Sequence, residues 1–161
     1  MPTSDGAAVV RRYLEDVLGG GNLDLLDELV APGYRDNTAR PGRSPGVDGI
    51  RQVTRMFRTA FPDLTLAVED CLTDGDRVAT RFTLRGTHTG PFAGLAATGR
   101  QVAIGGMAIS RLVDGRIAEQ WDQADMLELL RQLGAFPTPA PTPHGNANQH
   151  RSDHKEEHQW G

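Results

Sequence analysis

The chain has 161 residues, of which 38% are hydrophobic and 24% charged, with a formal net charge of −4 at pH 7. This predicts one globular domain and argues against a nucleic-acid partner, because no basic stripe runs along the sequence. No window approaches the roughly 20 apolar residues that span a bilayer, and Met1–Gly6 lacks a signal-peptide core. The single cysteine, Cys71, excludes an intrachain disulfide and favours a reducing compartment, so we expect a cytoplasmic protein with no membrane partner.

The chain changes character after Phe136, which divides it into a folded domain, residues 1–136, and a tail, residues 137–161. The tail begins with alternating prolines, which cannot continue a helix, and goes on with a polar run too poor in apolar surface to offset its ordering entropy. We therefore expect a disordered tail. Three of its histidines, His150, His154 and His158, would share a helix face and could hold a metal, but a solvated tail is the favoured interpretation.

The first 60 residues predict three helices, because apolar residues recur at intervals of three and four. Ser4 or Asp5 can cap the first helix, and Asn22 can cap the second. A glycine run ends the first helix, and Pro32-Gly33 ends the second. The predicted helices cover residues 5–18, 22–31 and 47–60.

From residue 64 the apolar residues alternate with polar or small ones, which predicts strands. Asp74-Gly75 and Asp114-Gly115 are expected to form tight hairpin turns between them. The pair Gly105-Gly106 predicts a bulge or bend that curves the sheet. A closing helix is predicted over Asp125–Leu133. The predicted strands cover residues 64–68, 77–85, 100–113 and 116–123.

Helices that precede hairpin-linked strands indicate an α+β fold rather than a Rossmann-type sheet. A strongly bent antiparallel sheet wrapped by helices leaves a cavity at its open end, where a small molecule would bind. The folded part shows neither metal-ligand spacing nor a phosphate-binding glycine loop, so these patterns predict no metal site and no nucleotide-phosphate site.

Several short strings in the folded part resemble one family when they are taken together. They are Phe61-Pro62-Asp63-Leu64, Gly86-Thr87-His88-Thr89-Gly90, Arg111-Leu112-Val113-Asp114-Gly115, Trp121 with Asp125, and Arg131-Gln132-Leu133-Gly134. In order and spacing, over about residues 7–136, they resemble the SnoaL-like polyketide cyclases, within the larger group shaped like nuclear transport factor 2 and ketosteroid isomerase. The resemblance implies a cone of strongly curved antiparallel sheet, wrapped by three to four helices around one pocket, and a homo-oligomer formed through the sheet.

The resemblance also implies a reaction. Family members close a ring of an aromatic polyketide by intramolecular aldol condensation without a cofactor, and an aspartate near the end of the last strand serves as acid and base. Here that position falls on Asp122 or Asp125, and we prefer Asp125, which follows Trp121 at the family's spacing. Asp125 can equally be the N-cap of the closing helix, with Glu128 as capping-box partner. Asp122 should face away from Trp121, because neighbours on a strand alternate.

The remaining candidates are a histidine and a set of pocket walls. His88 is the only histidine of the folded part and is either an acid/base partner or a loop histidine bonded to backbone. Where family members often carry an Asp-His pair, this chain has Asp36-Asn37, so Asn37 is a candidate donor to a carbonyl oxygen. Aromatic walls could stack on a flat polycyclic substrate or simply form core. The expected substrate-binding residues are Trp121, Phe92, Asn37, Tyr34, Met107 and Phe57.

Two other functions stay open on the sequence. A hydrolase, dehydratase or hydroxylase could use the same pocket. An epoxide hydrolase of this shape needs an Asp-Arg-Asp arrangement around a water, for which Arg81 and Arg111 are the candidate arginines. Alternatively, the domain binds a small molecule without catalysis. A pocket plugged by Trp121, Phe92 and Met107, with Asp125 pointing outward as a helix cap, would favour that alternative. A buried Asp125 that faces apolar walls would favour an enzyme.

Overall fold

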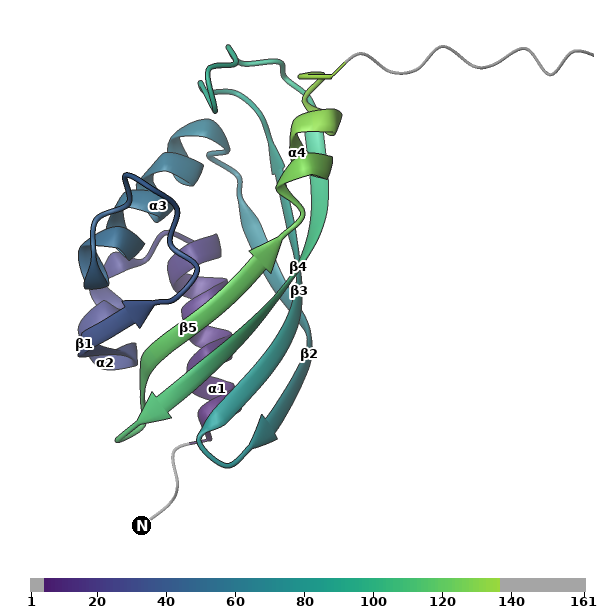
Figure 1. Ribbon diagram of the computed structural model, residues 1–161. Coiled ribbons are helices and arrows are strands. Elements are labelled where there is room, and N and C mark those ends of the chain that lie inside the picture. The colour runs from purple at the N-terminus through teal and green to yellow at the C-terminus, as the bar shows by residue number, and fades with distance from the viewer. Residues whose placement is uncertain (1–4, 137–161) are drawn as a thin grey trace, which may run out of the picture.

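The computed structural model describes residues 5–136, so the tail expected at residues 137–161 lies outside the described residues. Helices and strands follow one another as Figure 1 shows. The helical segments are α1 (Gly6–Arg12), η1 (Tyr13–Gly19), η2 (Leu23–Leu25), α2 (Leu26–Leu29), α3 (Gly46–Ala60) and α4 (Met126–Gln132). The strands are β1 (Val30–Asp36), β2 (Thr65–Asp74), β3 (Arg77–Thr87), β4 (Gln101–Val113) and β5 (Arg116–Ala124). Within this part of the chain, the helices are all too short or too polar to cross a membrane.

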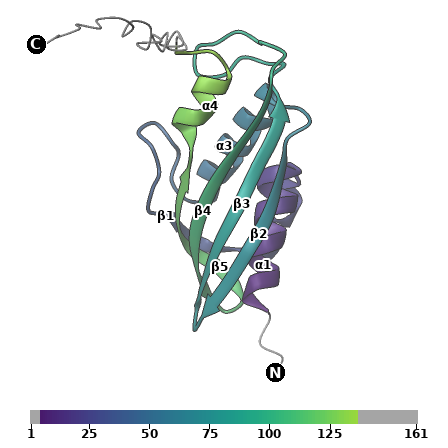
Figure 2. The ribbon, with the colours of Figure 1, turned by 90° about the vertical axis from the view of Figure 1, so that its right-hand side faces the viewer.

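The five strands form one sheet in the order β1-β5-β4-β3-β2. Strands β2 to β5 pair antiparallel with their neighbours, whereas β1 pairs in parallel with β5. The sheet twists and curves along its length, and Figures 1 and 2 show α1 and α3 lying together on one side of it. These features confirm the expected α+β fold, a curved sheet with helices wrapped around one pocket.

The first helical arm, which consists of α1 and η1, packs on the sheet through a large apolar core. Asp5 caps α1 by accepting the N–H of Ala7 at 3.2 Å, as its position at the helix start predicts. The arm then widens into a π-helix, η1, whose buried residues Tyr13, Leu14 and Val17 join this core. Each buried side chain of this size contributes about 1.5–3 kcal/mol, so the core fixes the arm against β2 and its neighbours.

A second core closes the far end of the sheet. Phe61, just past the end of α3, packs there with Leu84 of β3 and with Leu129 of α4. Residues of both cores line the cavity described below.

One strand was not predicted from the sequence. Pro32-Gly33 was expected to end the second helix, but that helix ends at Leu29 and the pair lies within β1. A proline and a glycine are tolerated there because β1 is an edge strand, and its register with β5 shifts between Val30 and Arg35. The prediction failed because the partner strand β5 lies far away in the sequence.

Of the bulge or bend expected at Gly105-Gly106, the bulge is absent. The β3–β4 register runs unbroken through the pair, with Gly106 opposite Phe82. A Cβ at position 106 would clash with the end of the Phe82 ring. Position 106 therefore needs a glycine because the Phe82 ring lies across it. From the sequence alone, a glycine that makes room for a neighbouring ring looks the same as a glycine in a bulge.

Candidate active site

A cavity of about 470 Å³ opens between the sheet, the π-helix η1 and helix α3. This volume suits a small organic molecule. A π-helical segment re-aims side chains within a helix and is frequent at functional sites, and here it supplies three wall residues. The apolar walls include Tyr13, Leu14 and Leu18 of η1, Ile50, Val53 and Phe57 of α3, and Leu66, Phe82 and Leu84 of the sheet.

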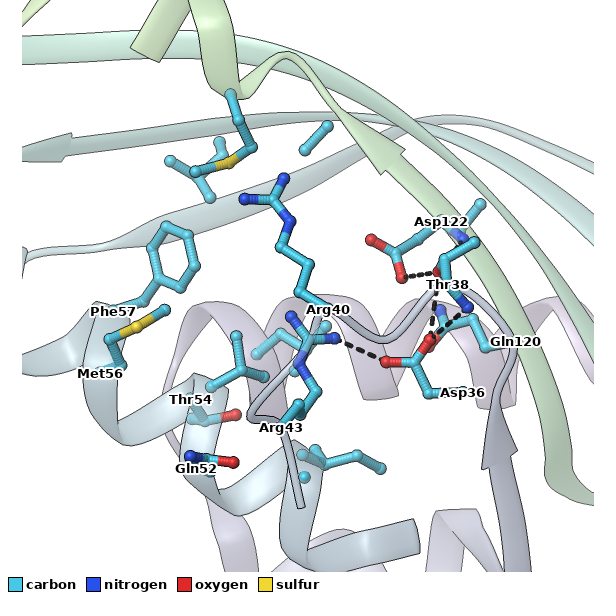
Figure 3. Close-up of a pocket in the computed structure, with 18 of the residues that line it drawn as sticks. Asp36, Thr38, Arg40, Arg43, Gln52, Thr54, Met56, Phe57, Gln120 and Asp122 are labelled. Atoms are coloured by element: carbon cyan, nitrogen blue, oxygen red, sulfur yellow. Dashed lines mark hydrogen bonds and ion pairs between the residues drawn. The ribbon is translucent and has the colours of Figure 1, made fainter. Parts of the chain in front are cut away.

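One end of the cavity carries a polar network that joins β1, β5 and the loop after β1 (Figure 3). Thr38 lies between two carboxylates, with its Oγ1 2.9 Å from Asp122 Oδ1 and 3.1 Å from Asp36 Oδ1. The same Oγ1 accepts the backbone N–H of Asp122 at 3.1 Å. Asp36 also pairs with Arg43, whose Nη1 lies 2.6 Å from Asp36 Oδ2. The network fixes one oxygen of Asp122, while Oδ2 makes no hydrogen bond within residues 5–136 and points into the cavity (Figure 3).

The surroundings of Asp122 make it a stronger base than an ordinary aspartate. Burial raises the pKa of Asp122 above its usual value, and the negative charge of Asp36 raises it further. The hydrogen bond from Thr38 and the positive charges of Arg43 and Arg40 oppose this rise. The balance leaves a part-buried carboxylate whose proton affinity is increased without an ion pair of its own among the described residues.

Two tyrosines extend the network away from the carboxylates. Tyr34 donates its hydroxyl proton to Gln120 Oε1 at 3.1 Å, and its hydroxyl also interacts with that of Tyr13. Burial raises the pKa of both phenols, so both stay neutral and can act as hydrogen-bond donors. Both line the cavity, and Tyr34 was among the residues expected there.

The structure places Asp125 outside the cavity. Its carboxylate accepts the N–H of Glu128 at 2.9 Å and caps α4, and the side chain is exposed. Asp122, one residue after Trp121, faces the cavity instead. Trp121 faces the opposite side of the sheet, where the guanidinium of Arg77 lies 5.6 Å from its ring centroid. The expected alternation of Trp121 and Asp122 therefore holds, but it is the aspartate that reaches the site.

His88 also lies away from the cavity lining. It is fully buried, and its Nδ1 accepts the backbone N–H of Thr98 at 3.2 Å. The other ring nitrogen, Nε2, has no partner among the described residues. The ring packs 5.4 Å from that of Phe61. His88 thus ties the glycine-rich loop to the aromatic cluster behind the cavity wall.

The other expected pocket residues divide into two groups. Phe57, Phe92 and Tyr34 line the cavity, and the rings of Phe57 and Phe92 lie 5.3 Å apart. Asn37 is exposed and outside the lining, although its backbone N–H donates to Gln120 O. Met107 is 63% exposed on the outer face of the sheet. Neither Met107 nor Trp121 plugs the cavity.

Several cavity residues were missed from the sequence. Asp36 and Thr38 form an Asx-turn, in which the aspartate accepts the N–H two residues on at 2.9 Å, and this local motif could have been read from the sequence. Gln120 shares a strand face with Asp122, two residues away, so it follows once Asp122 is placed. No signal in the sequence separates Arg40 and Arg43 from the exposed arginines.

The arginines considered for an epoxide hydrolase lie elsewhere. Arg81 pairs with Asp70 at 2.6 Å, and Arg111 pairs with Glu119 at 3.0 Å, both outside the cavity lining. Among residues 5–136, no cluster of three or more histidine, cysteine, aspartate or glutamate side chains is arranged to hold a metal ion.

Comparison with known proteins identifies the family. The family model of the SnoaL-like polyketide cyclases matches residues 8–133. The aklanonic acid methyl ester cyclase DnrD of Streptomyces peucetius is 39% identical over 142 residues, which cover 85% of this chain and 94% of the relative. The chain belongs to the SnoaL-like polyketide cyclase family. A second SnoaL-like relative, the nogalonic acid methyl ester cyclase of Streptomyces nogalater, is 29% identical over 116 residues, or 71% of this chain and 87% of the relative.

The SnoaL-like architecture is also seen in solved structures. TsrD from Streptomyces laurentii superposes with a TM-score of 0.76 at 31% identity, covering 84% of this chain and 99% of that one. The resemblance drawn from the short sequence strings is thereby confirmed, and with it the function as a polyketide cyclase enzyme that acts on a small molecule.

Proposed function

We propose that this enzyme closes a ring of a polyketide by intramolecular aldol condensation, with Asp122 as acid and base. The position of Asp122 supports this most: it is a part-buried carboxylate on the wall of a mostly apolar cavity, and burial raises its pKa. Such a carboxylate binds a proton more strongly than an ordinary aspartate, which suits a group that must take up a proton and return it. Because the relatives are named for methyl ester substrates, we propose an aromatic polyketide methyl ester as substrate.

The steps balance without any oxidant or reductant. Asp122 Oδ2 removes a proton from a carbon between two carbonyl groups, and the electron pair left behind forms an enolate. The enolate carbon attacks a ketone carbon of the same molecule, so a carbon–carbon bond forms while the carbonyl π electrons move to oxygen. The resulting alkoxide takes the proton back from Asp122, and the product is an isomer of the substrate.

Thr38 can serve both protonation states of Asp122. Its hydroxyl has one proton and two carboxylate oxygens within 3.1 Å. When Asp122 is ionised, Thr38 donates to it. When Asp122 carries the substrate's proton on Oδ2, Oδ1 can still accept the hydrogen bond of Thr38, or the Thr38 hydroxyl can turn its proton to Asp36. Neither state requires heavy atoms of the network to move, and the proton on Oδ2 stays at the cavity.

The apolar walls would position the substrate and keep water out. The Phe57 and Phe92 rings, on α3 and on the loop after β3, form one side of the cavity. Aromatic faces of this kind hold flat polycyclic molecules in offset or tilted stacks. The non-catalytic alternative was favoured by a plugged pocket together with an outward Asp125. Asp125 does point outward as the cap of α4, but Met107 and Trp121 do not plug the cavity, and Asp122 supplies a carboxylate on its wall, which supports an enzyme. For Asp125 and His88 we propose capping and loop-anchoring roles.

The reaction class is tested by product analysis. Incubating the protein with an aromatic polyketide methyl ester should give an isomer of the substrate, with the same mass and one more ring. NMR should show a new carbon–carbon bond at the carbon from which the proton is removed and a new hydroxyl group on the former ketone carbon. Conversion no faster than in buffer alone, across several such esters, would contradict the proposed reaction.

We also propose a homo-oligomer formed through the outer face of the sheet, as the family resemblance implies. On that face the apolar side chains of Met107 and Ile109 are 63% and 43% exposed, and Trp121 lies opposite Ile109 on the neighbouring strand. Burial of such side chains would stabilise an association. The cytoplasmic location expected from the single cysteine stays a prediction.

A further inference from the structure

An arginine that has no side-chain partner among residues 5–136 reaches into the cavity. Arg40 lies on the loop between β1 and α3 and lines the cavity, and Figure 3 shows its side chain extended between Phe57 and Asp122. Its guanidinium makes neither an ion pair nor a hydrogen bond with any residue from 5 to 136, whereas Arg43 pairs with Asp36 at 2.6 Å. A guanidinium has five donors and stays charged, so this one is free to bind oxygen atoms of a ligand.

The loop that carries Arg40 is braced on both sides. At its start, the Asx-turn of Asp36 holds the N–H of Thr38 at 2.9 Å. At its end, Gln52 of α3 accepts the N–H of Ser44 at 2.8 Å and donates to the carbonyl of Gly42 at 3.4 Å. Gly42 has a φ of +86°, which glycine adopts without strain. A braced loop presents Arg40 in one place, so little conformational freedom of the backbone is lost when a ligand binds.

Arg40 and Asp122 both reach the cavity, so one could bind the substrate oxygen while the other removes the proton. We propose that Arg40 binds the substrate oxygen that becomes negative when Asp122 removes the proton, so that the substrate is an aromatic polyketide whose enolisable ketone lies toward Arg40. The inference rests on the proposed ring closure and adds the group that holds the enolate. The ketone oxygen is neutral before proton removal and charged after it, so Arg40 favours the enolate over the bound substrate.

The kinetic test uses three variants. Arg40→Met removes the charge and keeps most of the side-chain length, and it should lower kcat by about 10²-fold with little change in KM. Arg40→Lys keeps a charge without the planar fork and should recover part of that loss. Arg55→Met makes the same change of charge at an exposed position of α3 outside the cavity and should behave as the native enzyme. An unchanged kcat in Arg40→Met would overturn the inference.

A second test does not depend on turnover. Alizarin is a flat dihydroxyanthraquinone whose absorption moves to longer wavelength when a hydroxyl ionises, so it mimics the enolate. Titrated in the presence of saturating native protein, it should ionise about one pH unit lower than in the presence of Arg40→Met, because the guanidinium stabilises the anion. Equal midpoints for the two proteins would refute the role of Arg40. A shifted midpoint in a protein that converts no polyketide would support Arg40 as the site for an anionic oxygen while rejecting the proposed reaction.

Discussion

At the scale of single residues, the proton affinity of Asp122 depends on one hydroxyl group. Thr38 lies 2.9 Å from Asp122 Oδ1, and its hydrogen bond lowers a pKa that burial raises. The base must be ionised to remove a proton, so the rate falls as pH drops through this pKa. If Asp122 is the base, as we propose, Thr38 therefore helps to set the lower pH limit of activity.

Thr38→Val should move that limit upward. Valine has nearly the shape of threonine but donates no hydrogen bond, so the pKa of Asp122 rises and a larger fraction of the enzyme is protonated at a given pH. The acid limb of kcat/KM, measured against pH, should shift to higher pH by about one unit. Thr38→Ser keeps the hydroxyl and should leave the limb in place, and a limb that is the same in Thr38→Val and native enzyme would contradict this role.

The sequence predicted part of the site at this scale, and the reason for each failure is physical. Phe57, Phe92 and Tyr34 were expected at the cavity and line it. The preference for Asp125 over Asp122 followed sequence spacing, which does not show which carboxylate faces inward. Because side chains alternate along β5, a single position decides between the cavity and the outer face.

At the scale of elements, features that depend on neighbouring residues were predicted correctly, whereas a strand that depends on a partner far away in the sequence was not predicted. The cap of α4 and the tight turns at Gly75 and Gly115 depend on a few neighbouring residues, so the sequence predicted them. Strand β1 exists because it pairs with β5, whose residues lie more than 80 positions further on, as in the pair Arg35 and Glu119. No short window of sequence contains that information.

The strand glycines give a matched pair of variants. Gly106→Ala should destabilise the fold by about 1–3 kcal/mol, because its Cβ would collide with the Phe82 ring in a packed core. Gly105→Ala should change stability by no more than about 0.5 kcal/mol, because its Cβ would meet nothing closer than Phe82 O at 4.0 Å. Urea denaturation of both variants measures the difference, and equal midpoints would show that the ring does not lie across Gly106.

At the scale of the whole molecule, the two faces of the sheet serve different purposes. The inner face supplies both cores and the cavity, while the outer face exposes Met107 and Ile109. The family resemblance predicted the curved sheet and a cavity against it, because the overall fold is kept while the sequence varies widely. It did not predict which charged side chains enter the cavity, since these vary on one architecture.

The proposed oligomer can be tested with one charge. Met107→Glu places a carboxylate at the centre of the exposed apolar face and should dissociate the assembly to single chains, as measured by light scattering after size exclusion. Leu127→Glu makes the same change at a 68% exposed position on α4 and should not alter the mass. A native protein that already has the mass of one chain would contradict an association through the sheet.

The choice of acid/base is tested most directly by comparing Asp122→Asn with Asp125→Asn on an aromatic polyketide methyl ester. Asparagine caps a helix about as well as aspartate, so Asp125→Asn keeps α4 intact and removes only the charge. We predict that Asp122→Asn lowers kcat by about 10²–10⁴-fold while Asp125→Asn retains native activity, with both proteins melting near the native temperature. Loss of activity in Asp125→Asn, with activity retained in Asp122→Asn, would contradict the account.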